Sequence, residues 1–308
     1  ADLGPIIDIH THLAHSFVLK PKLDLLADPG PTRHYLPVES PHDLDVYANQ
    51  NLTEVQRAEM TRDLTLHSVT GRGMCQTHTV PNLLREMEEM GVLYSVMLPI
   101  DLPGLSRNAE RYLEATRGTD HLLSFGCVHP SYRNQQGRLD AQIATGARGM
   151  KLHPGMMVMR PDHPRMVSLV GHCAGLTLLA LFHCGPVGIE PASSAERSQV
   201  RLYEKPIAEH PDATIILGHS GALQYDEAIE LARRYENVYL DLSCVALPVM
   251  KRIFDRVDPQ RILYGSDWPF YHQALPLVKV LLATEGQEEL RRRVLYANAA
   301  ALLDLPAA

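Results

Sequence analysis

From residue 81 onwards the chain repeats one unit, in which a helical segment ends at a glycine and an apolar strand follows. Helical periodicity at 82–90, 108–117, 138–145 and 165–174 is followed by apolar runs at 92–100, 122–128, 149–153 and 177–183. Glycine readily adopts the left-handed conformation that ends a helix, and a helix before every strand is typical of parallel sheets. The pattern therefore predicts an α/β fold.

The number of strands selects the architecture. A helix near 198–209 precedes a strand at 214–219, a helix at 225–235 precedes a strand at 238–243, and a last strand covers 261–267. With the apolar run at 5–13 this makes eight strands, which predicts a (β/α)8 TIM barrel, and helices at 274–284 and 288–303 would close the ring. A doubly wound open sheet would favour a glycine-rich phosphate turn after the first strand, where this chain has histidines. We expect one barrel domain over residues 1–308.

The stretch 14–80 interrupts this regularity. It contains five prolines, and one helix is predicted near 52–66. Such a length is unusual for a plain connection, so we interpret it as a lid-like insertion over the end of the first strand. Its histidines are predicted to lie at the surface or at the rim of the barrel; they are His15, His34, His42, His67 and His78.

Charge and cysteine content narrow the class of partner. A formal net charge of -7 and a pI near 6.1 argue against nucleic acid or an anionic membrane as the main partner, so a small molecule is expected. No apolar stretch reaches the ~18 residues of a membrane span, and no signal peptide is recognisable, which predicts a cytoplasmic protein. Five cysteines without Cys-x-x-Cys spacing are interpreted as reduced core residues. The oligomeric state stays open, and a homo-oligomer is one option.

Histidine, lysine and aspartate gather at the predicted strand ends. These residues are His10 and His12 on the first strand, Lys151 and His153 on the fourth, His183 on the fifth, His219 on the sixth and Asp267 on the eighth. Residues i and i+2 of a strand point to the same side, so His10 and His12 can offer nitrogens to one point. Taken singly, each residue could be a hydrogen-bonded rim residue or a helix cap. Together, at the catalytic end of one barrel, they indicate a metal site with an open position.

At these positions the sequence resembles the amidohydrolase superfamily, most closely its amidohydrolase-2 branch. The resemblance rests on Ile-Asp-Ile-His-Thr-His at 7–12, Gly-Met-Lys-Leu-His-Pro at 149–154, Tyr-Gly-Ser-Asp-Trp-Pro at 264–269 and Asn-Ala-Ala-Ala-Leu-Leu-Asp at 298–304. It spans nearly the whole chain and leaves only 14–80 unmatched. These motifs are specific to the superfamily as a combination, but they do not specify a substrate.

The resemblance implies a divalent metal, zinc by default with Mn, Fe or Co as alternatives, held by His10, His12, His183 and Asp267. His219 would be a general acid/base, and Asp267 would accept the proton of a metal-activated water. In binuclear relatives a carbamylated lysine at the position of Lys151 bridges two ions, and the histidines at the positions of His183 and His219 bind the second ion. We favour one metal, because Lys151 shares a strand face with His153 and could instead bind a substrate oxyanion.

The remaining assignments follow from position. His153 and Trp268 are predicted to contact the substrate, with Phe270 as a second wall residue. Asp8 and Asp241 are interpreted as hydrogen-bonding residues that orient neighbours and do not react.

Three functions are compatible with this site. The first is a metal-dependent hydrolase that cleaves an amide, lactam, lactone or ester bond of a small molecule. The second is a nonoxidative decarboxylase of an aromatic or muconate-type acid, since the same branch contains such enzymes. It would need a cation for the substrate carboxylate, with Arg33, Arg72, Arg133 and Lys151 as candidates. The third is a barrel that binds a ligand without turnover, which the occupied positions His219 and Asp267 disfavour.

Overall fold

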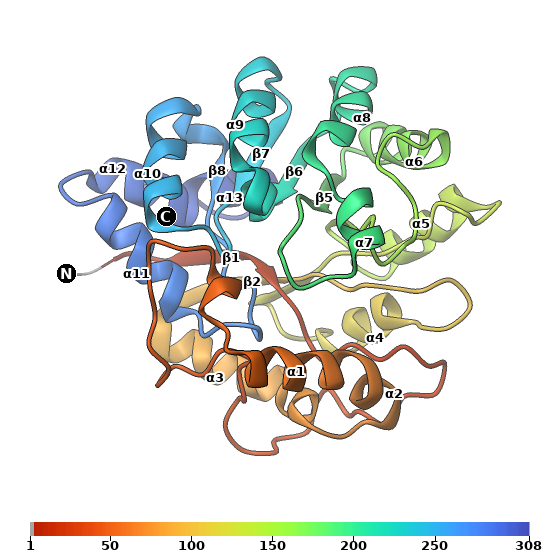
Figure 1. Cartoon of the computed structure of the whole chain (residues 1–308). Coiled ribbons are helices and arrows are strands. Elements are labelled where there is room, and N and C mark those ends of the chain that lie inside the picture. The colour runs from red at the N-terminus through yellow and green to blue at the C-terminus, as the bar shows by residue number, and fades with distance from the viewer. Residues whose placement is uncertain (1–2, 308) are drawn as a thin grey trace.

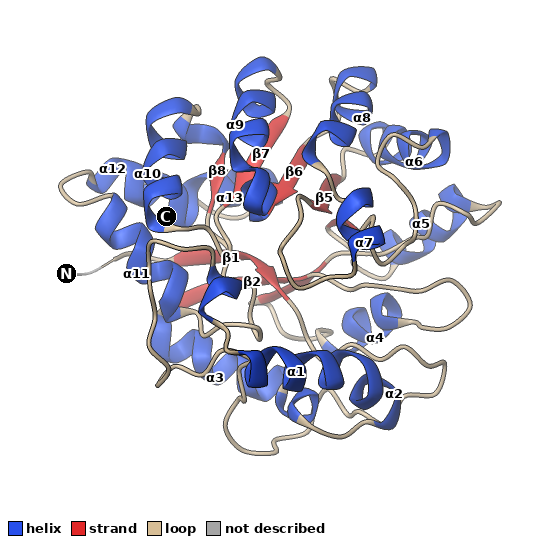
Figure 2. Cartoon of the chain, viewed as in Figure 1, coloured by secondary structure: helices blue, strands red, loops and turns tan. Residues whose placement is uncertain are grey.

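The computed structural model describes residues 3–307, and it shows eight parallel strands surrounded by helices (Figures 1 and 2). The strands are β1 (Ile6–Thr11), β2 (Val92–Met97), β3 (Leu122–Ser124), β4 (Gly149–Leu152), β5 (Leu179–His183), β6 (Ile215–Gly218), β7 (Val238–Asp241) and β8 (Ile262–Leu263). Neighbours in sequence are neighbours in space, in the orders β1-β2-β3 and β4-β5-β6-β7-β8.

Backbone hydrogen bonds join these two groups of strands into a barrel. Between β3 and β4, the amide of Lys151 donates to the carbonyl of Gly126 at 2.8 Å. Between β8 and β1, the amide of Ile9 donates to Tyr264 at 3.0 Å and the amide of Asp267 donates to His10 at 2.8 Å. The predicted (β/α)8 barrel is therefore confirmed.

The last strand is shorter than predicted. Only Ile262–Leu263 is regular, although the prediction ran from 261 to 267. Asp267 has a positive φ of 64°, so the backbone is not extended at the residue where the predicted strand ends.

The helices lie mainly on the outside of the barrel. They are α1 (Glu54–Arg62), α2 (Ser68–Thr70), α3 (Val80–Met90), α4 (Asn108–Ala115), α5 (Gln135–Ala144), α6 (Pro164–Gly175), α7 (Ala192–Arg197), α8 (Glu204–Glu209), α9 (Tyr225–Arg234), α10 (Leu247–Arg256), α11 (Ala274–Ala283), α12 (Glu288–Arg292) and α13 (Asn298–Leu303). The helix predicted at 198–209 is divided into a 3₁₀ turn at Val200–Tyr203 and α8. Pro206 lacks the amide hydrogen that a continuous helix would use there.

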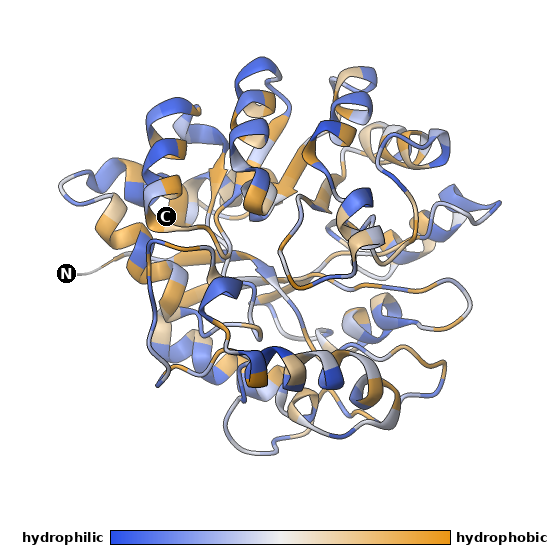
Figure 3. Cartoon of the chain, in the orientation of Figure 1, coloured by the Kyte–Doolittle hydropathy of each residue, from blue (hydrophilic) through white to orange (hydrophobic). Residues whose placement is uncertain are grey.

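Two apolar clusters build the core. One cluster fills the barrel interior, because it contains strand residues from different sides of the barrel, such as Ile9, Leu181 and Ile216. It also contains Ala299 and Leu303 of α13, which close one end of the barrel. The other joins the opposite strand faces to the helices. The strands are accordingly hydrophobic and the outer helix faces hydrophilic (Figure 3).

The insertion packs against the loops that follow β7 and β8. A third apolar cluster contains Tyr35, Tyr47 and Met60 of the insertion together with Cys244 and Tyr271 of those loops. The amide of Ala48 donates to the carbonyl of Cys244 at 3.0 Å, and the amide of Leu36 donates to that of Phe270 at 3.1 Å. In Figure 1 this segment crosses one side of the barrel through α1 and α2.

This packing corrects one prediction. His15, His34 and His78 are buried, although surface or rim positions were expected, because the insertion packs against the rest of the barrel: His15 lies beside Tyr112, His34 beside Glu86 and His78 beside Trp268. His42 and His67 are half-buried. The cysteine prediction is confirmed, since all five are buried and unpaired.

Candidate active site

The two histidines of β1 present their Nε2 atoms to one place. Nδ1 of His10 lies 2.5 Å from a carboxylate oxygen of Asp241, and Nδ1 of His12 lies 2.6 Å from the carbonyl oxygen of Leu98. Because both partners can only accept, each Nδ1 carries the proton and each Nε2 presents a lone pair. A metal-binding histidine is typically held in this way by an acceptor behind it.

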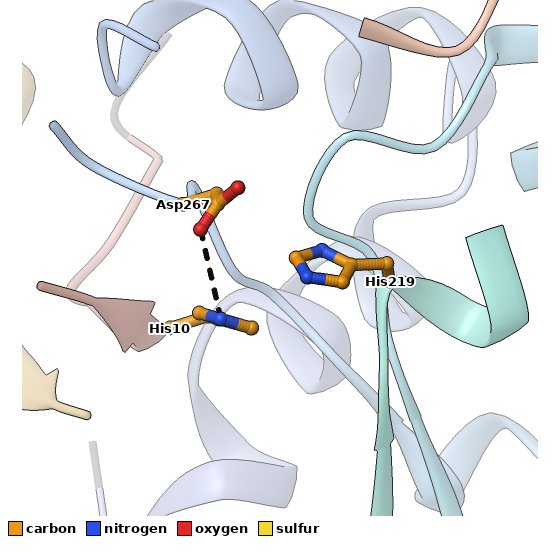
Figure 4. Close-up of side chains that lie close together, drawn as sticks. All are labelled: His10, His219 and Asp267. Atoms are coloured by element: carbon orange, nitrogen blue, oxygen red, sulfur yellow. Dashed lines mark ion pairs between the residues drawn. The ribbon is translucent and has the colours of Figure 1, made fainter. Parts of the chain in front are cut away.

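Asp267 faces both of these nitrogens. Its Oδ1 lies 3.6 Å from Nε2 of His10 and 3.3 Å from Nε2 of His12, and its Oδ2 accepts a hydrogen bond from the thiol of Cys244 at 3.2 Å. Figure 4 shows the carboxylate directed at His10, with the ring of His219 beside them. Burial raises the pKa of Asp267 to about 7, against the opposing effects of Cys244 and the charge of Lys151.

Lys151 reaches the same place from β4. Its neighbours Met150 and Leu152 pack against the helices, so strand alternation directs Lys151 into the barrel. Its Nζ lies 3.2 Å from Nε2 of His10, and its side chain is almost fully buried. Burial lowers the pKa of Lys151 to about 8, while the charges of Asp267 and Asp241 oppose that shift.

His219 and His183 form a second pair beside this cluster. Nε2 of His219 lies 3.2 Å from Nδ1 of His183, and Nδ1 of His219 lies 2.8 Å from the hydroxyl of Ser243. That hydroxyl donates in turn to Asp241 at 3.0 Å, so Asp241 orients both His10 and His219. The role predicted for Asp241, orienting a neighbour, agrees with these contacts.

The histidines of the site are neutral. Burial, followed by the charge of Lys151, lowers the pKa of His12 and of His183 to about 3. Burial also lowers the pKa of His10 and that of His219 well below the ordinary value. Neutral imidazole is the form that binds a metal ion.

The structure divides the expected ligand set. The nitrogens of His10 and His219 and a carboxylate oxygen of Asp267 all lie within 4.8 Å of one another, and His12 adjoins Asp267. His183 contacts His219, and its ring stacks on that of His153 with centroids 4.0 Å apart and 7° between the planes. The residues whose ligand atoms lie close together therefore include His219, which was expected to act on the substrate. They do not include His183, which was expected to bind the metal.

These residues fit a divalent cation. Two imidazole lone pairs and a carboxylate oxygen converge, and all three are acceptors that would repel one another without a positive charge between them. In the structure the ammonium nitrogen of Lys151 lies 3.2 Å from one of these lone pairs, that of Nε2 of His10. A set of two or three nitrogens and one oxygen suits zinc and also Mn, Fe or Co.

A cavity of about 300 Å³ opens onto this cluster. Apolar atoms make up most of the exposed surface of its wall. The apolar residues are Met60, Leu64, Ile100, Met156, Val187, Ile189 and Phe270, and the polar ones include His12, Tyr47, Asn49, Lys151, His153, His183, Glu190, His219 and Asp267. Lys151 is the single lysine or arginine among the described residues of this wall. Arg33 and Arg133 line other cavities.

Trp268 lies behind this cavity and not on its wall. Its side chain is fully buried, and its indole nitrogen donates to Glu86 at 3.0 Å. Phe270, two residues later, faces the cavity instead, with its ring centroid 6.1 Å from that of His12. His153 lies on the wall, as expected for a residue near a substrate.

Three residues at the site were missed by sequence reasoning. Ser243 and Cys244 lie two and three residues after Asp241 of β7, so extending the survey of strand ends by three residues would have found them. Tyr47 comes from the insertion, and its buried hydroxyl has no hydrogen-bond partner among the described residues. Nothing in the local sequence distinguishes Tyr47 from the other tyrosines.

Comparison with known proteins extends these observations. The family model described as "Amidohydrolase" matches residues 7–305. An uncharacterized TIM-barrel protein from Bordetella bronchiseptica has a TM-score of 0.69 at 16% identity, over 97% of this chain and 98% of its own. No curated protein matches the sequence significantly.

Two further solved structures carry the names of enzymes. A probable 2-pyrone-4,6-dicarboxylic acid hydrolase from Acinetobacter baumannii, with citric acid bound, has a TM-score of 0.61 at 13% identity, over 97% of this chain and 99% of its own. 2,6-Dihydroxybenzoate decarboxylase from Rhizobium has a TM-score of 0.59 at 16% identity, over 96% of this chain and 99% of its own. At these identities the likeness shows the fold.

None of the helices within residues 3–307 is long and apolar enough to cross a membrane.

Proposed function

The chain belongs to the amidohydrolase family, and from this premise we propose that it is a metal-dependent hydrolase of a small molecule with an amide, lactam, lactone or ester bond. The observation that carries the proposal is the convergence of His10, His12 and Asp267 at the end of a mainly apolar cavity. His10, His12 and Asp267 would hold the metal, joined by His183 or His219. Bound there, a divalent ion would act as a Lewis acid on a carbonyl group or a water molecule.

The protein's own groups supply the proton transfers of hydrolysis. Asp267 is an acceptor whose Oδ2 is oriented by the thiol of Cys244, so it can take a proton from an attacking water. His219 is held from behind by Ser243, so its Nε2 is directed to the site as an acceptor; it can take this proton from Asp267 and pass it to the leaving group. Lys151 would stabilise negative charge that develops on the carbonyl oxygen.

The cavity wall supports a compact substrate that carries little negative charge. A volume of about 300 Å³ lies at the lower end of small-molecule sites, and the wall is mainly aliphatic and aromatic. With Lys151 as its one basic residue, this wall offers no arginine to bind a second carboxylate. We therefore place lactones, lactams, esters and amides with at most one free carboxylate first.

Decarboxylation is the second candidate, and one contact favours it. Lys151 is buried beside the proposed metal ligands, where it could pair with a substrate carboxylate. Arg33 and Arg133 line other cavities, so Lys151 would have to serve alone.

One assay separates the two reactions. The protein is stripped with a chelator, reloaded with Zn²⁺ or Mn²⁺, and offered lactone, ester, amide and aromatic-acid panels in water enriched in ¹⁸O, with Asp267→Asn as the inactive control. Hydrolysis places ¹⁸O in the product carboxylate and requires the restored metal. Release of carbon dioxide from an acid, without ¹⁸O in the organic product, would replace our proposal with the decarboxylase. Absence of both signals in metal-loaded protein would contradict both.

A further inference from the structure

A second group of potential metal ligands lies outside the cavity described above. It consists of His34 from the insertion, Glu86 from α3 and His272 from the loop between β8 and α11. One nitrogen or oxygen from each residue lies within 4.8 Å of the others. His34 and Glu86 are 8% and 5% exposed, so this is not a chance meeting of solvated surface groups.

The contact between His34 and Glu86 requires a proton or a metal ion between them. Nδ1 of His34 lies 3.0 Å from the carbonyl oxygen of Pro269, which can only accept, so this nitrogen carries a proton. Nε2 of His34 lies 3.0 Å from Oε2 of Glu86, which is also an acceptor. Either a second proton or a metal ion must therefore join Nε2 to the carboxylate.

Neighbouring groups orient the side chains of His34 and Glu86 through hydrogen bonds, as they commonly do for metal ligands. The backbone carbonyl behind His34 fixes its ring in the same way that Leu98 fixes His12. Glu86 accepts hydrogen bonds from the indole of Trp268 at 3.0 Å and from the backbone amide of Gln273 at 2.8 Å. Such outer contacts orient the ligands of metal sites and strengthen binding.

His272 supplies the third atom. Its Nδ1 is unprotonated, because it accepts a hydrogen bond from the amide of Ala274 at 3.1 Å, and it lies 3.7 Å from Oε1 of Glu86. A metal bound to this nitrogen would replace the hydrogen bond from Ala274. The side chain of His272 is 19% exposed, which leaves a path from solvent.

The three residues share a separate cavity of about 530 Å³, large enough for a hydrated ion. Glu59 and Glu89 add negative charge to its wall. Arg85, on the same wall, is already paired with Asp28 at 2.9 Å, whereas Arg33 adds a positive charge that a bound cation would have to tolerate.

We propose that His34, Glu86 and His272 form a second metal site, which binds a divalent transition metal such as Zn²⁺ through two nitrogens and one carboxylate. Water would complete the coordination from the cavity side. The metal connects the insertion to α3 and to the loop 269–273, which begins two residues after Asp267. Its role is to hold the insertion in place, and it does not depend on which reaction the first site catalyses.

The test counts metal ions and needs no substrate. Chelator-stripped wild type, His272→Ala, Glu86→Gln and His12→Ala are dialysed against Zn²⁺, and the bound zinc is measured by elemental analysis, with thermal unfolding recorded with and without zinc. His42→Ala is the matched control, because His42 is a half-buried histidine of the same insertion outside the cluster.

We expect His272→Ala and Glu86→Gln to bind one zinc fewer than wild type and His42→Ala, or to bind it at least about 10-fold more weakly. The zinc-induced rise in Tm should shrink in the same two variants. His12→Ala should lose a different equivalent and keep this one. Wild-type zinc content and an unchanged Tm shift in His272→Ala would overturn the proposal and leave a proton between His34 and Glu86. If Glu86→Gln does not fold, His272→Ala decides alone.

Discussion

Asp241 accepts a hydrogen bond from Nδ1 of His10 at 2.5 Å, although 231 positions separate the two residues in the sequence. The contact places the proton of His10 on Nδ1 and turns Nε2 towards Asp267 and Lys151. A residue that touches neither the cavity nor the proposed substrate thereby decides what His10 can bind.

Replacing this carboxylate should weaken metal binding. In Asp241→Asn the amide can donate as well as accept, so His10 is no longer held in one tautomer, and we expect metal affinity to fall by about 10–100-fold. Competition with a chromophoric chelator measures the loss. Asp258→Asn is the control, because Asp258 is exposed at the start of a helical turn and does not line the cavity. Equal affinity in both variants would contradict the role given to Asp241.

Metal counts should separate the ligands from the acid/base residue. His10→Ala and His12→Ala remove ligand atoms, so metal content and activity should fall together. His219→Asn should keep the metal in a mononuclear site and lose about 10²-fold or more in kcat. Counting is done in a His272→Ala background, so that the second proposed site does not contribute. A loss of one of two equivalents in His219→Asn or Lys151→Ala would establish a binuclear site instead, and loss of a single bound metal in His219→Asn would make His219 a ligand in place of His183.

Tyr47→Phe should affect the substrate and not the protein. The hydroxyl of Tyr47 is buried against the cavity without a hydrogen-bond partner among the described residues, so its removal leaves no other group unpaired. We expect kcat/KM to fall by about 2–10-fold, the value of one hydrogen bond, with metal content and Tm unchanged. Tyr239→Phe on β7 provides the comparison. Identical kinetics in both variants would mean that Tyr47 does not contact the substrate.

Gly185→Ala should damage the site more than the same change elsewhere. Gly185 and Gly118 have similar φ values of 82° and 80°, but a Cβ at 185 would clash with the carbonyl of Gly221, whereas one at 118 meets open space. Gly118→Ala should cost about 1–2 kcal/mol of the free energy of unfolding, for the backbone alone. Gly185→Ala should cost at least about 1 kcal/mol more and reduce metal binding, because His183 is two residues away. Urea unfolding of both variants checks this, and equal losses would show that the loops adjust.

Lys279 should give the free energy of unfolding a distinct pH dependence. Burial lowers the pKa of Lys279 from 10.5 to about 8, and its ammonium group donates to the carbonyl of Val245 at 2.9 Å. Between these two pKa values the unfolded chain binds more protons than the folded protein. The free energy of unfolding of the wild type should therefore rise with pH relative to that of Lys279→Met, by up to about 3 kcal/mol. Urea unfolding of both proteins from pH 7 to 10 measures the difference. A difference that does not change with pH would show that Lys279 is not desolvated.

The insertion shows where local sequence stops being informative. Its prolines correctly predicted an irregular segment, and the helix near 52–66 was found as α1 and the π-helical turn Asp63–His67 after it. Yet its histidines were predicted to be exposed, and three of them are buried. Burial of a residue in such a segment depends on the loops it packs against, and no periodicity within the segment reports those loops.

The sequence by itself determined the barrel and the chemical types at its strand ends, since both follow from short-range patterns: alternation along a strand, helical period, and glycine at helix ends. Only the tertiary structure decided which of these residues meet. It paired Asp241 with His10, turned Trp268 away from the cavity towards Glu86, and brought Tyr47 over the site. These contacts join residues that are far apart in the chain, so they exist only once the barrel has closed and the insertion has packed against it.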